Sequence, residues 1–317
     1  MSRVVWELIA TTFNEFWEDK AQRLGAALAY YAAFSLAPTL VIVVYVANMV
    51  YLDNSLTHLH ARIAAVVGVN AADAIIATIH ALQSTGGGGM ATALSVLALF
   101  IGATAAFGSL QDAMNTIWEV TPKPRHFLID ILRTRFFSFL MVLCFCLSLI
   151  LSLAASTAMA IAEKHFETEY PGTTMLFKMA NQLLAFTLTT IVFAALYKVL
   201  PDVRLAWSDV SIGAVCTATL FTLGRIPLEM YLRSSTLSSA YGAAGSVMVL
   251  LAWVYYSSQI LFLGAEFTQV YANRFGSHIR PARGAVFISE AARIKQGIPH
   301  AATLREAHRE ESRKWSA

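Results

Sequence analysis

Long apolar stretches alternate with short polar connectors along most of the chain. The first stretch, Ala26–Tyr51, contains no charged side chain, and five more of similar length follow it. At about 1.5 Å of rise per residue, a helix of this length crosses the roughly 30 Å hydrocarbon core of a bilayer. We therefore predict six membrane-spanning helices, at residues 26–50, 90–110, 136–162, 181–200, 208–230 and 245–270.

The spans are expected to be helices and not barrel strands. Lipid offers the backbone no hydrogen-bond partner, so only helices and closed barrels cross it. These apolar runs are continuous, whereas barrel strands alternate with a period of two. The expected fold class is all-α, a polytopic membrane protein with one transmembrane domain at residues 26–275 and additional amphipathic interfacial helices.

Two segments beside the spans have amphipathic patterns. In residues 1–25, Val5, Ile9 and Phe13 recur at helical spacing, which predicts an interfacial amphipathic helix or, alternatively, a cytoplasmic helix packed on the bundle. The outer loop at 52–89 carries two apolar stripes and predicts two short amphipathic helices. They would form either a lid over a cavity or a structural cap.

The distribution of basic residues predicts the orientation. Of the 23 Lys and Arg residues, eighteen lie in the N-terminal segment, the alternate connectors and the tail, and four lie on the opposite side. Cytoplasmic segments carry the excess of basic residues, so both termini are predicted to be cytoplasmic. The tail at 276–317 is expected to be helical near Ala301–Trp315 and otherwise disordered.

Composition narrows the class of protein further. Hydrophobic residues make up 57% of the 317 positions and charged residues only 14%, against about a quarter charged in soluble domains. The net charge of +3 is spread out, so no nucleic-acid partner is expected. The three cysteines lie within apolar segments and predict no disulfide framework, and no cleavable signal peptide is evident. The sequence lacks the P-loop, zinc-helix and nucleophile-elbow motifs, which predicts a non-enzyme without metal or cofactor.

Ionisable residues inside spans are the first functional candidates, because burying them in lipid is costly. Arg225 and Glu229 lie four positions apart on one helix face, with Pro227 between them. A proline kink beside a polar pair predicts the wall of a hydrophilic cavity. The alternative is a local ion pair that reaches water at the outer interface.

Glu266 is the second candidate and lies near the cytoplasmic end of the last span. Gly264 and Ala265 precede it, and small residues allow close helix approach. Glu266 is therefore expected to face a neighbouring helix, either as a coupling or substrate-contacting carboxylate or as an interfacial anchor bonded to Asn273 or a loop arginine.

The end of the second span and one further proline complete the candidates. Asp112 and Asn115 form a polar helix end beside the aromatic Trp118. They are candidates for the pathway or, alternatively, structural anchors. Pro38 is expected to kink the first span near the middle of the membrane.

Several segments resemble one known family. The matching segments are Leu28–Pro38, Leu110–Trp118, Leu200–Trp207, Tyr241–Ser246 and Leu250–Glu266. In order and spacing they are similar to the YihY/BrkB family of bacterial membrane proteins, from about residue 10 to 275. The resemblance implies a six-helix inner-membrane protein of Gram-negative type. Family members have been labelled serum-resistance virulence factors, transfer-RNA-processing ribonucleases and exporters of lipids or lipopolysaccharide precursors.

Three functional hypotheses follow. The first is a transporter or flippase of an amphiphilic, lipid-like substrate in the cell envelope, without ATP hydrolysis of its own. The second is an ion channel or ion-coupled transporter using the candidate charges, and the third is a non-transporting envelope scaffold. Ribonuclease activity is not expected, because the cytoplasmic loops lack clustered carboxylates or histidines. The expected partners are membrane lipids, further copies of the chain, which its small-residue faces permit, and envelope-transport proteins.

Overall fold

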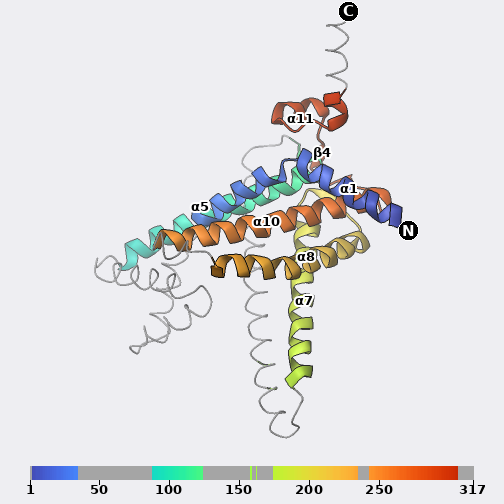
Figure 1. The fold of residues 1–317 in the computed structure, drawn as a ribbon. Helices are drawn as coiled ribbons and strands as arrows, with labels where there is room; N and C mark the ends of the chain where they lie inside the picture. Colours follow the sequence, from blue (N-terminus) through green and yellow to red (C-terminus); the bar gives the residue numbers. More distant parts are fainter. Residues whose placement is uncertain are drawn as a thin grey trace, which may run out of the picture. The chain divides into compact units, whose positions relative to one another are not determined.

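The computed structural model describes residues 2–34, 88–123, 174–234 and 243–305, with isolated positions at 158 and 162. These residues belong to two compact units. The first unit holds residues 1–24, 110–223 and 259–317, and the second holds residues 25–109 and 224–258. Figure 1 shows the elements of each unit along the chain.

Long helices make up most of the described residues (Figure 1). They are α5 (Gly88–Ile117), α7 (Thr174–Val199), α8 (Trp207–Ser234) and α10 (Ala243–Arg274). Three stretches among the described helices are long and apolar enough to cross a membrane: Met175–Val199, Trp207–Pro227 and Met248–Arg274.

The three stretches overlap the last three predicted spans. The predicted span 90–110 lies within the helix α5, which continues beyond it to Ile117. The predicted span at 26–50 lies largely outside the described residues, and the span at 136–162 and the loop at 52–89 lie almost wholly outside them. The total of six spans therefore stays a prediction.

The N-terminal segment contains two helices where one was expected. Helix α1 (Ser2–Glu18) ends at a turn in which Lys20 has a φ of 53°, and a second helix covers residues 21–34. A left-handed residue interrupts the helical hydrogen-bond ladder. The turn brings Asp19 to a buried position at the end of α1.

The tail differs most from expectation. Residues expected to be disordered form the strands β3 (Arg280–Pro281) and β4 (Ala285–Phe287) and the helix α11 (Glu290–Gln296). Strand β4 pairs antiparallel with β1 (Val120–Pro122), and β3 pairs antiparallel with β2 (Val203–Arg204). The backbones of two connectors thus supply partners that the tail sequence could not reveal. The short strands also correct the all-α expectation, although the fold is mostly helical.

Close helix packing forms the core of the first unit. The buried Tyr197 hydroxyl on α7 donates to the carbonyl oxygen of Leu261 on α10, at 2.8 Å, and lies 2.8 Å from Thr217 Oγ1 on α8. On α10, Gly264 lies directly against Thr217, so that a Cβ on the glycine would overlap the threonine side chain. These contacts fix the part of α10 that carries Glu266.

Candidate functional site

Charged residues from the N-terminal segment, the end of α5, α10 and the tail interact within the first unit. We call this group the carboxylate cluster. It comprises five carboxyl groups and two basic groups: Glu15, Asp19, Glu119, Glu266, Glu290, Arg293 and His300.

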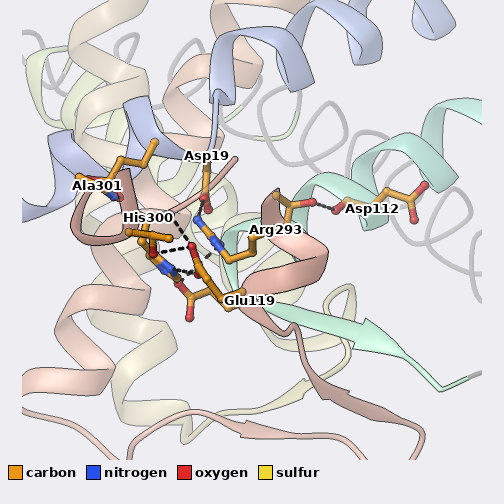
Figure 2. Close-up of polar contacts among 10 residues, drawn as sticks. Asp19, Asp112, Glu119, Arg293, His300 and Ala301 are labelled. Carbon is orange, nitrogen blue, oxygen red and sulfur yellow. Dashed lines mark hydrogen bonds and ion pairs between the residues drawn. The ribbon is translucent and has the colours of Figure 1, made fainter. Parts of the chain in front are cut away.

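The centre of the cluster is a buried ion pair between the turn after α1 and the helix α11. Arg293 Nη2 donates to Asp19 Oδ1 at 2.7 Å, and the two side chains are only 1% and 2% exposed (Figure 2). Arg293 Nη1 lies 3.6 Å from Glu119 Oε1. The pair joins residues 274 positions apart in the sequence, so it ties the tail to the N-terminal segment.

His300 bridges two carboxylates at the edge of the cluster. Its Nε2 lies 2.9 Å from Glu119 Oε1, and its Nδ1 lies 2.6 Å from Glu290 Oε2 (Figure 2). Ionised carboxylates only accept hydrogen bonds, so both ring nitrogens must carry hydrogen and the ring is an imidazolium. Although burial opposes it, the hydrogen bonds to Glu119 and Glu290 raise the pKa of His300. Hydrogen bonds from His300 and Thr303 lower the pKa of Glu290 to about 2.

Glu266 projects from α10 into the same group of charges. Its side chain is fully buried, and neither carboxyl oxygen has a hydrogen-bond partner among the described residues. It interacts electrostatically with Asp19, Glu15 and Glu119, and with Arg293. Counted from Arg274 at the end of the helix, Glu266 lies about 12 Å inside the span.

The site holds more acidic than basic groups, and this alters its protonation. Burial raises the pKa of Asp19 to about 7, and Glu119 and Glu15 add to the effect against the opposing charge of Arg293. Burial likewise raises the pKa of Glu15, with further contributions from Glu18 and Glu119. A surplus of carboxyl groups in a poorly solvated site favours bound protons.

Helix capping places Arg293 in the cluster. Ser289 caps the N-terminus of α11 and accepts from the amide of Ala292, and Gly297, with a φ of 73°, ends the helix. Glu290 in the first turn and Pro299 after the end complete the start and stop signals of a short helix. These signals were present in the sequence, but the mixed charge of the tail suggested disorder instead.

The cluster contains one of the residues predicted from sequence. Glu266 is buried, as the small residues before it suggested. Its interpretation as an anchor bonded to Asn273 does not agree with the contacts, because Asn273 Oδ1 accepts from the amide of Ile279 instead. Asp19, Glu119 and Arg293 were not predicted, because the partners come from distant parts of the chain.

Asn115 takes part in a separate polar contact. Its Nδ2 donates to Asp202 Oδ2 at 3.0 Å, and its Oδ1 accepts from the Asp202 amide at 2.8 Å. The exchange ties the end of α5 to the connector between α7 and α8, a structural contact. Asp112 is exposed, and its backbone carbonyl accepts from Thr116 (Figure 2). The two residues therefore lie in different surroundings.

The remaining candidates lie in the second unit or outside the described residues. Arg225 is exposed on α8 and takes part in an interaction, and the helix continues through Pro227. The side chain of Glu229 and the whole of Pro38 fall outside the described residues. The cavity wall and the kinks therefore stay predictions.

The chemistry of the cluster is that of proton binding. Within the described part of the chain, no three His, Cys, Asp or Glu side chains are arranged to hold a metal ion. The groups present are carboxyls and an imidazolium, which exchange protons near physiological pH when their surroundings shift them.

Comparisons with known proteins match most of the chain. A family model described as virulence factor BrkB matches residues 12–288. A UPF0761 membrane protein of Glaesserella parasuis serovar 5 (strain SH0165) is 27% identical over 181 residues, which cover 56% of this chain and 60% of the relative.

Two further relatives have the same description. A UPF0761 membrane protein of Vibrio vulnificus (strain CMCP6) is 27% identical over 199 residues, covering 62% of this chain and 60% of the relative. One of Photobacterium profundum is 25% identical over 251 residues, covering 79% of this chain and 76% of the relative. The chain thus spans 60% of the length of the first two relatives. No solved structure matches it.

Proposed function

The chain belongs to the virulence factor BrkB family, and for this family member we propose proton-coupled transport of an amphiphilic, lipid-like substrate across the bacterial inner membrane. Glu266 is the proposed proton carrier, and the carboxylate cluster exchanges its proton with the cytoplasm. The proposal joins the first two hypotheses drawn from the sequence, a lipid-like cargo and ion coupling.

The observation that carries the proposal is the state of the Glu266 carboxyl. Both oxygens are buried without hydrogen-bond partners among the described residues. An ionised carboxylate in such surroundings is one of the costliest groups to bury, so the stable form here carries a proton. Release of that proton creates a buried charge, which favours a different arrangement of α10 and its neighbours. This is the differential stability that coupling requires.

A polar face on α10 supports a path from Glu266 deeper into the span. Gln259 lies seven residues earlier, which puts it on the same helix face at a distance of about 10 Å along the axis. The buried nitrogen and oxygen of its side-chain amide also lack partners among the described residues. Unpartnered polar atoms within a span are typical of residues that line a hydrated path.

Composition supports the class of cargo. With 57% hydrophobic and 14% charged residues, the chain offers few groups that could bind a highly charged solute inside the membrane. The sequence contains no P-loop, so a proton gradient is the proposed source of energy. The proposed orientation has both termini in the cytoplasm, because the basic residues concentrate on that side.

The alternative of an envelope scaffold has less support. That hypothesis used the tail as a docking element, yet β3 and β4 pair with connectors of the same chain and α11 holds Arg293 in the cluster. A docking role is therefore proposed at most for residues beyond 305. The channel alternative lacks a specific observation in its favour.

Reconstitution in liposomes tests the proposal. Transfer of a fluorescent phospholipid between leaflets and the internal pH are recorded together, with and without an imposed pH gradient. We expect the gradient to accelerate lipid transfer in the native protein and in the control variant Glu7→Gln, and to have no effect in Glu266→Gln. Lipid transfer equal to that of empty liposomes would reject the lipid-like cargo. Equal gradient dependence in Glu266→Gln and the native protein would reject the proton carrier.

A further inference from the structure

Helix α1 carries two apolar surfaces, only one of which is covered. Leu8, Thr12 and Phe16 are buried against the first unit. Next to them on the helix, an exposed apolar arc runs along the whole length of α1. Its members, with their exposed fractions, are Val5 (52%), Trp6 (71%), Ile9 (42%), Phe13 (48%) and Trp17 (64%).

The opposite side of the same helix is polar. Arg3, Glu7 and Asn14 lie there and are exposed. A helix with aromatic side chains on one exposed arc and charges on the other has the pattern of a helix lying in the plane of a membrane surface. Tryptophan in particular prefers the boundary between headgroups and acyl chains.

The position of α1 relative to the spans identifies the occupant of the arc. Arg274 ends the candidate span Met248–Arg274, and its Nη2 donates to Glu7 Oε2 at 2.6 Å. The ends of the other two spans lie at the same level, because Ser277 donates through its amide to Asp209 Oδ2 near the start of α8. Trp207 begins that span, is 60% exposed and contacts Lys198 near the end of α7 at 5.3 Å. Together these contacts mark the membrane boundary within the first unit.

We propose that α1 lies in the cytoplasmic face of the bilayer, with the apolar arc inserted at the boundary between headgroups and acyl chains. The occupant of the arc is lipid, not a second protein. Because Asp19 directly follows α1 and Glu15 lies on it, lipid contact then holds two acidic groups of the carboxylate cluster in place. The proposal concerns the helix alone and does not depend on the transported substrate.

Spin labels on the full-length protein in lipid nanodiscs test it. Single cysteines replace Ile9 or Phe13 on the arc and Arg3 or Asn14 on the polar side, in a background in which Cys144, Cys146 and Cys216 are changed to serine or alanine. All four positions are exposed, so the labels disturb no core contact, and unchanged thermal melting verifies the fold.

Collisions with two relaxing agents identify the surroundings of each label. We expect the arc labels to collide several-fold more with oxygen, which concentrates in lipid, than with a water-soluble nickel chelate, and the polar-side labels to show the reverse. Arc labels that collide with the chelate as often as the polar-side labels would overturn the proposal. Arc labels protected from both agents, or broadened by a second label nearby, would also overturn it and indicate a protein partner or a second copy.

Discussion

Gly264 on α10 and Thr217 on α8 pack so closely that a Cβ on the glycine would lie 2.8 Å from the threonine Cβ. The contact is reciprocal one turn further along, where a Cβ on Gly213 of α8 would lie 2.7 Å from the Cβ of Thr268 on α10. Each glycine thus faces a threonine four residues from the other glycine. The two helices interlock antiparallel just beside Glu266.

Replacement of either glycine should therefore destabilise the first unit. We expect Gly264→Ala to cost about 1–3 kcal/mol of unfolding free energy, the usual cost of overpacking, because a methyl group has no room beside Thr217. Thermal unfolding in detergent, followed by loss of the monodisperse fraction, measures the effect. Gly108→Ala is the matched control, since a Cβ there meets no atom within 4 Å. Equal melting temperatures for the two variants would contradict the interlocked packing.

The buried ion pair should contribute far more than an exposed pair of equal length. Arg293→Met removes the counter-charge of the buried Asp19 and should cost about 3 kcal/mol or more. Arg274→Met breaks the pair with Glu7, whose side chains are 37% and 46% exposed, and should cost less than about 1 kcal/mol. Denaturant unfolding of both variants provides the measurement.

The pH dependence of the first variant provides an additional check. Burial raises the pKa of Asp19 to about 7, so the carboxyl takes up a proton readily once the arginine is gone. The loss in Arg293→Met should therefore be larger at pH 8 than at pH 5.5. A loss independent of pH would show that charge is not its cause.

The contacts of His300 should make the tail sensitive to pH. The pKa of His300 is raised from 6.5, so its contribution is complete below that value and is lost as the pH rises through the higher, folded-state pKa. The pKa of Glu290 is lowered from 4.5 to about 2, so its contribution is complete above 4.5 and is lost as the pH falls through about 2. Amide exchange of residues 290–303, corrected for intrinsic rates, should show the strongest protection between about pH 4.5 and 6.5.

A pair of histidine variants verifies the assignment. His300→Gln should abolish the loss of protection at alkaline pH. His278→Asn, at an exposed residue with a φ of 55° that asparagine tolerates, should retain it. If both variants keep the dependence, His300 is not its source.

The contact between Asn115 and Asp202 should be structural. Asn115→Ala leaves the buried end of α5 without two hydrogen bonds and should cost about 1–3 kcal/mol. Asp112→Ala, three residues away and exposed, should change stability by less than about 0.5 kcal/mol. A double-mutant cycle of Asn115 and Asp202 measures the pair directly, and a coupling of zero would refute the interpretation.

Parts of this structure could be predicted from sequence because their signals are local. The apolar run before Arg274 predicts a helix, and the small residues Gly264 and Ala265 predict the burial of Glu266, since both act within a few turns. Asp19 and Arg293 could not be paired, because they lie 274 positions apart and each looks like an ordinary surface charge. The tail likewise becomes ordered through strand partners in connectors far from it in sequence.

The protonation of Glu266 tests the central claim most directly. Infrared spectra of the protein in liposomes, recorded over a range of pH, separate the carbonyl stretch of protonated carboxyl groups from that of carboxylates. The account predicts a protonated-carboxyl band at neutral pH that decreases on alkalinisation, is missing in Glu266→Gln and is retained in Glu7→Gln. Spectra of Glu266→Gln and the native protein that coincide in this band at every pH would contradict it.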